Sequence, residues 1–307
     1  MNSFQLAHIS DLHVLSLRGT PPWRMLNKRL TGLGNLIGPR RGAHPAWLAG
    51  ALVNRLDDPA IDHVAFTGDL TNLALPSEFD AGTALLARIG DGTRLSAVPG
   101  NHDVYTAGAA RSDRADRALA PWTEGTARRD TYPWCKAPVP WLRIYGLSSA
   151  IPAPPMIAWG EVGRAQLDRL AALIAAEPTE VRTRVVLVHH NVHRRGKRTE
   201  WTSRMRDADT VVNALIEAGV DVLLHGHTHA PHRGRIVRGA RALWVLGCGS
   251  STWHRPSHHE LAHLNLLTLT PDGLGAIRTE VWDDTARHFV VEHADALPTS
   301  ASVAVPL

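Results

Sequence analysis

Five short apolar segments of this chain each end in side chains that can bind a metal ion, and this pattern constrains the fold most. Each segment has the length of a buried strand. In open α/β folds, residues beyond the carboxyl ends of the strands gather at one edge of the sheet. The five groups are Asp11 with His13; Asp69; Asn101 with His102; His189; and His227 with His229. The sequence therefore predicts an α/β fold with a polar site at a sheet edge.

The donor set contains carboxylates, an amide and several imidazoles, but no thiolate. Such mixed oxygen and imidazole donors suit Mn, Fe or Zn. There are more donors than one ion needs, and two ions about 3.5–4 Å apart are a common device for displacement at phosphorus. We therefore expect two divalent metal ions, with Mn or Fe favoured and Zn, Co or Mg as the alternatives.

The stretch Gly100-Asn101-His102-Asp103 follows the apolar run 95–99 and is the most informative of the five groups. A turn that begins with glycine can hold side chains outward at unusual angles. The same residue types also form ordinary polar turns, so the tetrapeptide alone does not decide between the two. The four other strand ends of the same kind favour a reactive centre.

Composition is compatible with one large domain or with two small ones. The chain has 307 residues, of which 44% are hydrophobic and 20% charged. Cys135 and Cys248 stand far apart without a CxxC partner, which argues against a disulfide framework or a thiolate zinc site. We find no secretory signal pattern and no apolar run near the ~20 residues that span a membrane. A cytoplasmic location is expected, with peripheral membrane association as the alternative.

Hydrophobic periodicity predicts the order β-α-β-α-β, then further α/β units and an all-β end. The expected fold class is α/β, a four-layer α/β/β/α sandwich of two mixed β-sheets flanked by helices. One domain should cover residues 1–293, and residues 294–307 should form a mobile tail. Ser77 is a candidate N-cap for a helix over 77–89, and residues 104–140 should be loop and short helix.

Residues 14–44 are predicted to be an insertion. There is no acidic residue between Leu12 and Leu56, whereas arginine and lysine alternate with tryptophan and leucine. Glycines and prolines interrupt the helical pattern, so at most a short helix is expected near 22–30. The segment is either a solvated basic loop, a cationic lid for an anionic substrate, or a contact with an anionic membrane surface.

The motifs resemble the five blocks of the calcineurin-like metallophosphoesterases in order and spacing. The opening His8-Ile9-Ser10-Asp11-Leu12-His13 is most similar to the class III cyclic nucleotide phosphodiesterase branch, and the resemblance covers roughly residues 4–232. The blocks are Asp11-x-His13, Gly68-Asp69, Gly100-Asn101-His102-Asp103, the His189 segment and Gly226-His227-x-His229. This resemblance implies the metallophosphoesterase fold.

The resemblance also implies a role for each position. His102 would be the general acid, oriented by Asp103, and a hydroxide that bridges two metals would attack phosphorus. The implied ligands are Asp11, His13 and His229 for the first metal, Asn101, His189 and His227 for the second, and Asp69 as the bridge. All seven ligand positions are filled, which disfavours a metal-free structural relative.

The chain departs from the phosphodiesterase branch at one point. That branch usually continues His-His-Pro-Pro, whereas this chain has Asn191 and Val192 after its two histidines. Because of this departure, the resemblance predicts neither the pocket wall at this point nor the identity of the substrate. His190, Arg194 and Arg195 are candidate substrate contacts, and the basic runs 194–198 and 233–241 either face solvent or clamp a phosphate-rich substrate.

The leading hypothesis is a dinuclear metal-dependent phosphodiesterase that hydrolyses a small organic phosphodiester similar to a cyclic nucleotide. The alternative is a pyrophosphohydrolase or phosphodiesterase that acts on a lipid-linked or nucleotide-sugar substrate at the membrane surface. A nuclease is less favoured, and no specific nucleic-acid partner is expected, because the basic residues occur in separated runs without a stacking motif. The sequence leaves the oligomeric state and the preference for mono- or diesters open.

Overall fold

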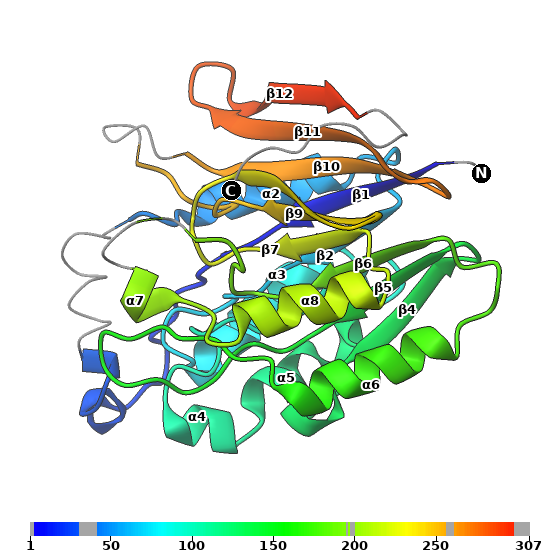
Figure 1. The fold of residues 1–307 in the computed structure, drawn as a ribbon. Helices are drawn as coiled ribbons and strands as arrows, with labels where there is room; N and C mark the ends of the chain where they lie inside the picture. The colour runs from blue at the N-terminus through cyan, green and yellow to red at the C-terminus, as the bar shows by residue number, and fades with distance from the viewer. Residues whose placement is uncertain (1–2, 31–41, 195, 197–199, 256–260, 298–307) are drawn as a thin grey trace.

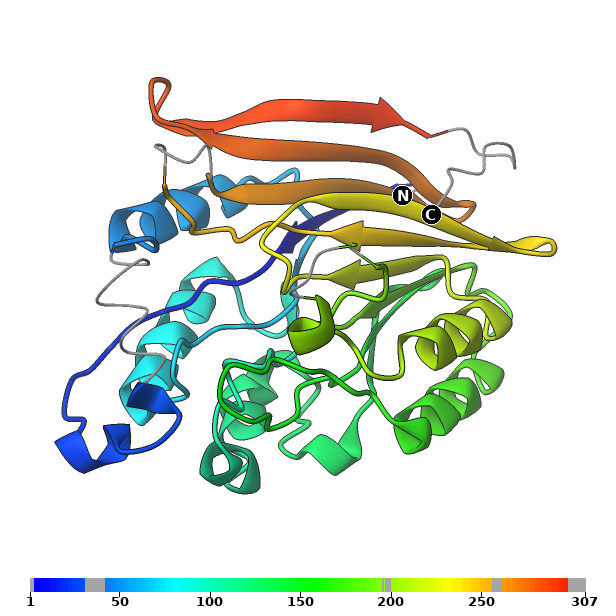
Figure 2. The ribbon, with the colours of Figure 1, turned by 60° about the vertical axis from the view of Figure 1, so that its left-hand side comes forward.

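The computed structural model describes residues 3–30, 42–194, 196, 200–255 and 261–297, and it contains two six-stranded sheets (Figures 1 and 2). The first sheet has the order β12-β11-β10-β1-β2-β3. Its strands β1, β2 and β3 are parallel, and β10, β11 and β12 continue the sheet in antiparallel fashion. The strand bounds are β1 Phe4–Ile9, β2 His63–Phe66, β3 Leu95–Ala97, β10 His263–Thr270, β11 Gly273–Asp283 and β12 His288–Ala296.

The second sheet has the order β4-β5-β6-β7-β9-β8, with parallel central strands and an antiparallel strand at each edge. Its bounds are β4 Trp134–Val139, β5 Leu142–Gly146, β6 Thr183–Leu187, β7 Val222–His225, β8 His232–Arg238 and β9 Arg241–Gly247. The longer helices are α2 Ala46–Leu56, α3 Pro76–Ile89, α6 Arg164–Ala175 and α8 Ala208–Glu217. The short helices are η1 Pro22–Met25, α4 Ala107–Arg111, α5 Arg114–Leu119, η2 Ala120–Trp122, η3 Arg129–Thr131 and α7 Glu200–Ser203.

The helices and sheets form the predicted four-layer α/β/β/α sandwich, and the core has three apolar layers, one between each pair of adjacent layers. Strand β1 shows the principle, because Leu6 packs between the two sheets while Ala7 and Ile9 pack against α2 and α3. Successive strand side chains point to opposite faces, so a strand buried on both faces reads as a continuous apolar run. Full burial of one such leucine contributes about 1.5–3 kcal/mol. The third layer joins the second sheet to α6 and α8.

Two segments predicted without strands form the edge strands of the second sheet. Strand β4 lies in residues 104–140, where loop and short helix were expected, and β8 comprises most of the basic run 233–241. Both contain residues that a central strand avoids, Lys136 and Pro138 in β4 and several arginines in β8. Charged residues and proline are typical of edge strands, which explains why the sequence pattern missed them.

The N-terminus of α3 and the end of the domain also differ from expectation. Ser77 lies inside α3, and its hydroxyl donates to the carbonyl of Ser16 over 2.7 Å. The carboxylate of Glu78 accepts from the backbone N–H groups of Leu73 and Leu75 instead. Strand β12 extends to Ala296, past the predicted boundary at residue 293, and residues 298–307 of the expected tail lie outside the described part. Within the described residues, none of the helices combines the length and the apolar character needed to cross a bilayer.

Candidate dinuclear metal centre

The seven predicted ligands lie in loops that follow five parallel strands, three from the first sheet and two from the second. Asp11 and His13 follow β1, and Asp69 follows β2. The remaining ligands are Asn101 after β3, His189 after β6, and His227 and His229 after β7. The loops continue the strand pairing, since Asp11 N–H donates to Gly68 and His13 N–H donates to the carbonyl of Asp69. The structure therefore brings together, at one end of both sheets, the residues that the sequence grouped.

Five of these seven residues have a left-handed backbone conformation. Their φ values are 54° for Asp11, 46° for His13, 58° for Asp69, 67° for His227 and 53° for His229. Positive φ is uncommon for residues other than glycine and costs about 1–3 kcal/mol when it is enforced. Strained backbone of this kind is characteristic of functional sites.

Two glycines allow the ligand loops to approach each other closely. A Cβ atom on Gly100 would lie 2.1 Å from Oδ1 of Asp69. A Cβ atom on Gly226 would lie 1.8 Å from Oγ of Ser10 and 2.5 Å from Oδ2 of Asp11. The motif glycines are therefore required by the packing of one ligand loop on another.

Replacing Gly226 with alanine is expected to destabilise the protein by about 1–3 kcal/mol, because the methyl group overpacks Ser10 and Asp11. It should also lower metal content, since Asp11 has to move. Thermal unfolding and elemental analysis of the purified variant measure both effects. The matched control is Gly50→Ala in α2, where a Cβ meets no atom within 4 Å and alanine favours the helix. Equal Tm and metal content in the two variants would contradict this account of the close approach.

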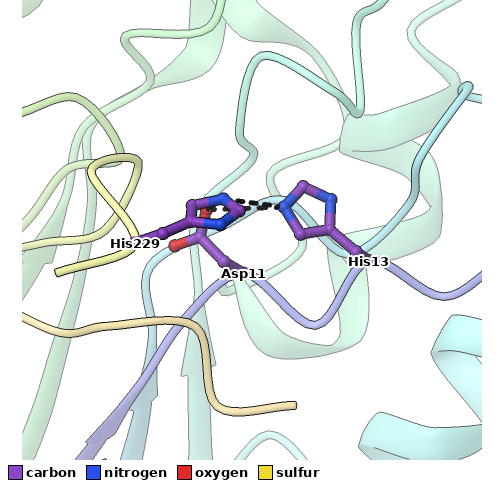
Figure 3. Close-up of side chains that lie close together, drawn as sticks. All are labelled: Asp11, His13 and His229. Carbon is purple, nitrogen blue, oxygen red and sulfur yellow. Dashed lines mark hydrogen bonds and ion pairs between the residues drawn. The ribbon is translucent and has the colours of Figure 1, made fainter. Parts of the chain in front are cut away.

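One group of donors consists of Asp11, His13 and His229 (Figure 3). The two Nε2 atoms of His13 and His229 are 3.1 Å apart. Oδ1 of Asp11 lies 3.2 Å from Nε2 of His229 and 3.7 Å from Nε2 of His13. The three side chains thus direct one carboxylate oxygen and two imidazole nitrogens at a common point.

A second group contains Asn101, His189 and His227. Oδ1 of Asn101 lies 3.1 Å from Nε2 of His189 and 2.9 Å from Nδ1 of His227. Oδ2 of Asp69 lies 3.3 Å from Nε2 of His189 and 3.9 Å from Nε2 of His13. Asp69 is consequently placed between the two groups, as a bridging ligand requires.

Backbone carbonyls fix the imidazoles of the second group. Nδ1 of His189 is 2.7 Å from the carbonyl of Thr67, and Nε2 of His227 is 2.8 Å from the carbonyl of Ser203. A ring nitrogen beside a carbonyl carries the proton, so the other nitrogen presents its lone pair. His189 therefore faces the centre with Nε2 and His227 with Nδ1.

The site fits a pair of divalent cations. Oδ1 of Asp11 is buried and receives no well-aligned hydrogen bond from the described residues. Ligand atoms in the groups Asp11–His13–His229 and Asp11–Asp69–His189 lie within 4.8 Å of one another. Bonds of about 2.0–2.2 Å to a shared ion place opposite ligands roughly 4 Å apart, so small adjustments suffice. The donor chemistry and the orphaned oxygen both agree with bound metal.

Charged groups in the site favour the ionised, metal-binding form of the two aspartates. Burial acts to raise the pKa of both aspartates, but His229 and His189 hold the pKa of Asp11 and Asp69, respectively, below the usual value. Burial also acts to lower the pKa of His189, yet the adjacent Asp69 carboxylate raises it to about 9. A metal that binds Nε2 of His189 therefore displaces a proton.

His102 lies at the edge of this centre. Its Nδ1 is 2.7 Å from the carbonyl of Asn72, and its ring stacks on Tyr105 with 5.3 Å between centroids. The side chain is half-buried and meets the ring of His13 edge-on at 4.9 Å. His102 also forms a group of ligand-type atoms with His13 and Asp69, so proximity alone is compatible with a proton donor or a ligand.

Asp103 was predicted to orient His102, but its carboxylate makes its hydrogen bonds to other groups. Its buried carboxylate accepts from the backbone N–H groups of Gly100, Leu70 and Thr71 and from the Thr71 hydroxyl, while Asn72 provides the carbonyl beside Nδ1 of His102. Asp103 thus ties the loop after β3 to the loop after β2. Burial raises its pKa to about 6, although these donors oppose the shift.

The predicted substrate contacts are not confirmed. His190 is fully buried, and its Nδ1 lies 2.8 Å from Oγ of Ser149. Its ring packs against that of the predicted ligand His227, with 4.4 Å between the centroids. Arg194 is exposed and lines a cavity of about 930 Å³ bounded by α8 and β8 that includes none of the seven ligands. Arg195 lies outside the described residues.

Several residues beside the ligands were missed from the sequence. The side chain of Asn72 donates to the carbonyl of His13, in addition to the contact of its own carbonyl with His102. His44 and Trp253 stand 4.8 Å from His13 and 5.1 Å from His229, respectively, measured between ring centroids. Asn72 follows Gly68-Asp69 closely, which was a usable signal, but nothing in the sequence connects His44 or Trp253 with the motifs.

A family model described as calcineurin-like phosphoesterase matches residues 4–231. Among solved structures, a dimetal phosphatase from Danio rerio is 15% identical, with a TM-score of 0.58 over 91% of this chain and 95% of that one. A purple acid phosphatase from yellow lupin (Lupinus luteus) seeds is 12% identical, with a TM-score of 0.58 over 94% of this chain and 53% of that one. At these identities the two structures show a shared fold. No curated protein matches this chain in sequence.

Proposed function

Because this chain belongs to the calcineurin-like phosphoesterase family and is a metal-dependent phosphoester hydrolase, we propose that it cleaves small organic phosphodiesters, with cyclic nucleotide-like esters as the first candidates. The assignment of residues follows the two donor groups. Asp11, His13 and His229 would hold one ion, and Asn101, His189 and His227 would hold the other, with Asp69 between them. Mn or Fe suits these ligands best.

The bound ions would supply Lewis-acid chemistry, namely activation of water and neutralisation of charge on the phosphoryl oxygens. The protein supplies the orientation of the ligands and the proton for the leaving group. His102 is the proposed proton donor, because the carbonyl of Asn72 fixes its Nδ1 and so orients the ring at the edge of the two donor groups. Its stacking on Tyr105 restricts the ring further.

The proposed preference for diesters is based on the hydrogen bonds that the neighbouring lysine and arginines make to backbone carbonyls. Lys28 Nζ donates to the carbonyls of Ala153 and Ile157 over 3.0 and 3.2 Å. Arg29 donates to the carbonyls of Leu73 and Ala74, and Arg114 also donates to Ala74. A phosphomonoester dianion carries more charge than a diester and is commonly met by arginine or lysine. Cations that are bound to the protein's own carbonyls favour the less charged diester.

Activity of the metal-reconstituted protein tests this proposal. With bis(p-nitrophenyl) phosphate and p-nitrophenyl phosphate the leaving group is the same, so the ratio of kcat/KM isolates the diester preference. We expect the diester to be favoured by about tenfold or more, which corresponds to ~1.4 kcal/mol in the transition state. Cyclic AMP and glycerophosphodiesters then define the natural class. A preference for the monoester would overturn the diester proposal and leave the hydrolase assignment intact.

A further inference from the structure

Large apolar side chains are exposed in three segments beside the metal centre. The exposed fractions are 70% for Trp23, 77% for Leu26 and 57% for Leu30 in the insertion, 75% for Met156 and 62% for Trp201. Helix η1, which carries Trp23, contains no buried residue. Soluble monomers seldom expose so many large apolar groups in neighbouring segments, and such patches mark interaction sites. We call these five residues the apolar rim.

The three segments are held side by side. The Lys28 ammonium donates to the carbonyls of Ala153 and Ile157, which flank Met156 in the sequence. Further along, Ala158 N–H donates to Thr202, and the Trp159 indole donates to the carbonyl of Trp201. Figures 1 and 2 show the blue insertion at an outer corner of the molecule, on the side toward which β1 runs. The three segments that carry the rim therefore form one border, although they come from distant parts of the chain.

This border adjoins the metal centre on two sides. Lys28 lies over the ring of Tyr105 at 4.6 Å, and Tyr105 stacks on His102. On the other side Ser203, two residues after Trp201, places its carbonyl 2.8 Å from Nε2 of His227. A surface that covers the rim thus comes to lie next to the site.

Arg29 attaches the insertion to the body of the protein. The guanidinium of Arg29 is buried and donates to the carbonyls of Leu73 and Ala74, directly after the loop that carries Asn72. Met156 has a φ of 64°, a strained value for a residue that is not glycine. A conformation that costs free energy and presents methionine to solvent points to a use for that exposure.

The insertion, which carries three of the five rim residues, is positively charged. Arg18 and Arg24 are exposed, and there is no acidic residue from 13 to 56. Burial lowers the pKa of Arg114, and the charges of Arg24 and Arg117 lower it further. Basic side chains beside tryptophan and leucine are the combination that binds the interface of anionic membranes.

We propose that the apolar rim docks on an anionic lipid bilayer, with Trp23, Leu26, Leu30 and Met156 entering the interface and Arg18 and Arg24 near the lipid phosphates. Docking in this orientation brings the metal centre to the membrane surface. If the proposed function holds, lipid-borne phosphoesters become accessible substrates. Lys28 and Arg29 serve as anchors within the protein, so they are not part of the lipid-binding surface.

Sedimentation with vesicles tests the docking. Vesicles of equal parts phosphatidylglycerol and phosphatidylcholine should bind the protein, and pure phosphatidylcholine should bind it at least several-fold more weakly. Trp23→Ser combined with Leu26→Ser should lower the partition coefficient by about tenfold or more, and Met156→Ser should lower it less. Arg24→Glu should weaken binding to the anionic vesicles alone, and this difference should disappear at high salt.

The matched controls are Leu173→Ser on α6 and Val291→Ser on β12, which are 40% and 54% exposed and lie outside the rim. Both should bind vesicles like the unmodified protein. All variants should retain turnover of bis(p-nitrophenyl) phosphate when metal is restored, which separates failed docking from failed chemistry. No vesicle binding, or equal binding by rim and control variants, would overturn the proposal. A dimer that dissociates in the rim variants, without vesicle binding, would instead show that a second copy covers the rim.

Discussion

Replacing Asp69 with asparagine is expected to remove at least one metal ion and reduce turnover to background. The carboxylate lies between the two donor groups, with Oδ2 3.3 Å from Nε2 of His189 and 3.9 Å from Nε2 of His13. A neutral amide offers one oxygen and no charge, so it is a poor bridge between two cations. The pKa of His189 should also fall, because Asp69 is the main group that raises it. Elemental analysis and turnover of the same preparation measure the effect.

Asp221→Asn is the matched control for this variant. The carboxylate of Asp221 accepts from the backbone N–H of Arg184 over 2.8 Å at the opposite end of β7, far from the ligand loops. This control should keep both metals and its turnover. Two ions per chain together with near-normal turnover in Asp69→Asn would show that Asp69 does not bridge.

Replacing His102 with alanine should preserve both metals and slow turnover by about 10²–10⁴-fold for esters with a poor, alkoxide-type leaving group. The loss should be much smaller for p-nitrophenyl esters, because p-nitrophenolate leaves readily without a proton. The physical basis is the fixed ring, which holds Nδ1 beside the carbonyl of Asn72 and stacks on Tyr105. Turnover across esters of graded leaving-group pKa, with metal content determined in parallel, gives the test.

The Asp103→Asn variant separates the effect of proton donation by His102 from the effect of disturbing the loops after β2 and β3. The carboxylate of Asp103 accepts hydrogen bonds from Gly100, Leu70 and Thr71, so this variant should lower the free energy of unfolding. It should not reproduce the dependence on leaving group. An equal loss on every ester in His102→Ala, or the loss of a metal from it, would make His102 a ligand or a structural residue.

The fold class and the grouping of the ligands could be predicted from the sequence. The apolar runs 4–9 and 184–188 correspond to β1 (Phe4–Ile9) and β6 (Thr183–Leu187), which are buried on both faces, and the length and composition of such runs are local properties. Neighbouring parallel strands place their carboxyl ends at one edge, so Asp11 after β1 and Asp69 after β2 had to converge once the strands were recognised. His189 follows β6 of the second sheet, and the packing of the two sheets on each other brings it to the same place. Edge strands β4 and β8 were missed because an edge tolerates charge and proline. The cytoplasmic location remains a prediction.

Sequence by itself determined which side chains are available at the centre, because a motif gives the residue types and their positions at the end of a strand. Tertiary structure alone decided what each side chain contacts. Asp103 and His102 are neighbours in the chain, yet Asp103 bonds the loop after β2 and Asn72 provides the carbonyl beside His102. Every residue has a backbone carbonyl, so the contacts of the Thr67 and Ser203 carbonyls with His189 and His227 cannot be predicted from the residue types. The same holds for the apolar rim, since burial depends on how much of the rest of the chain covers a residue.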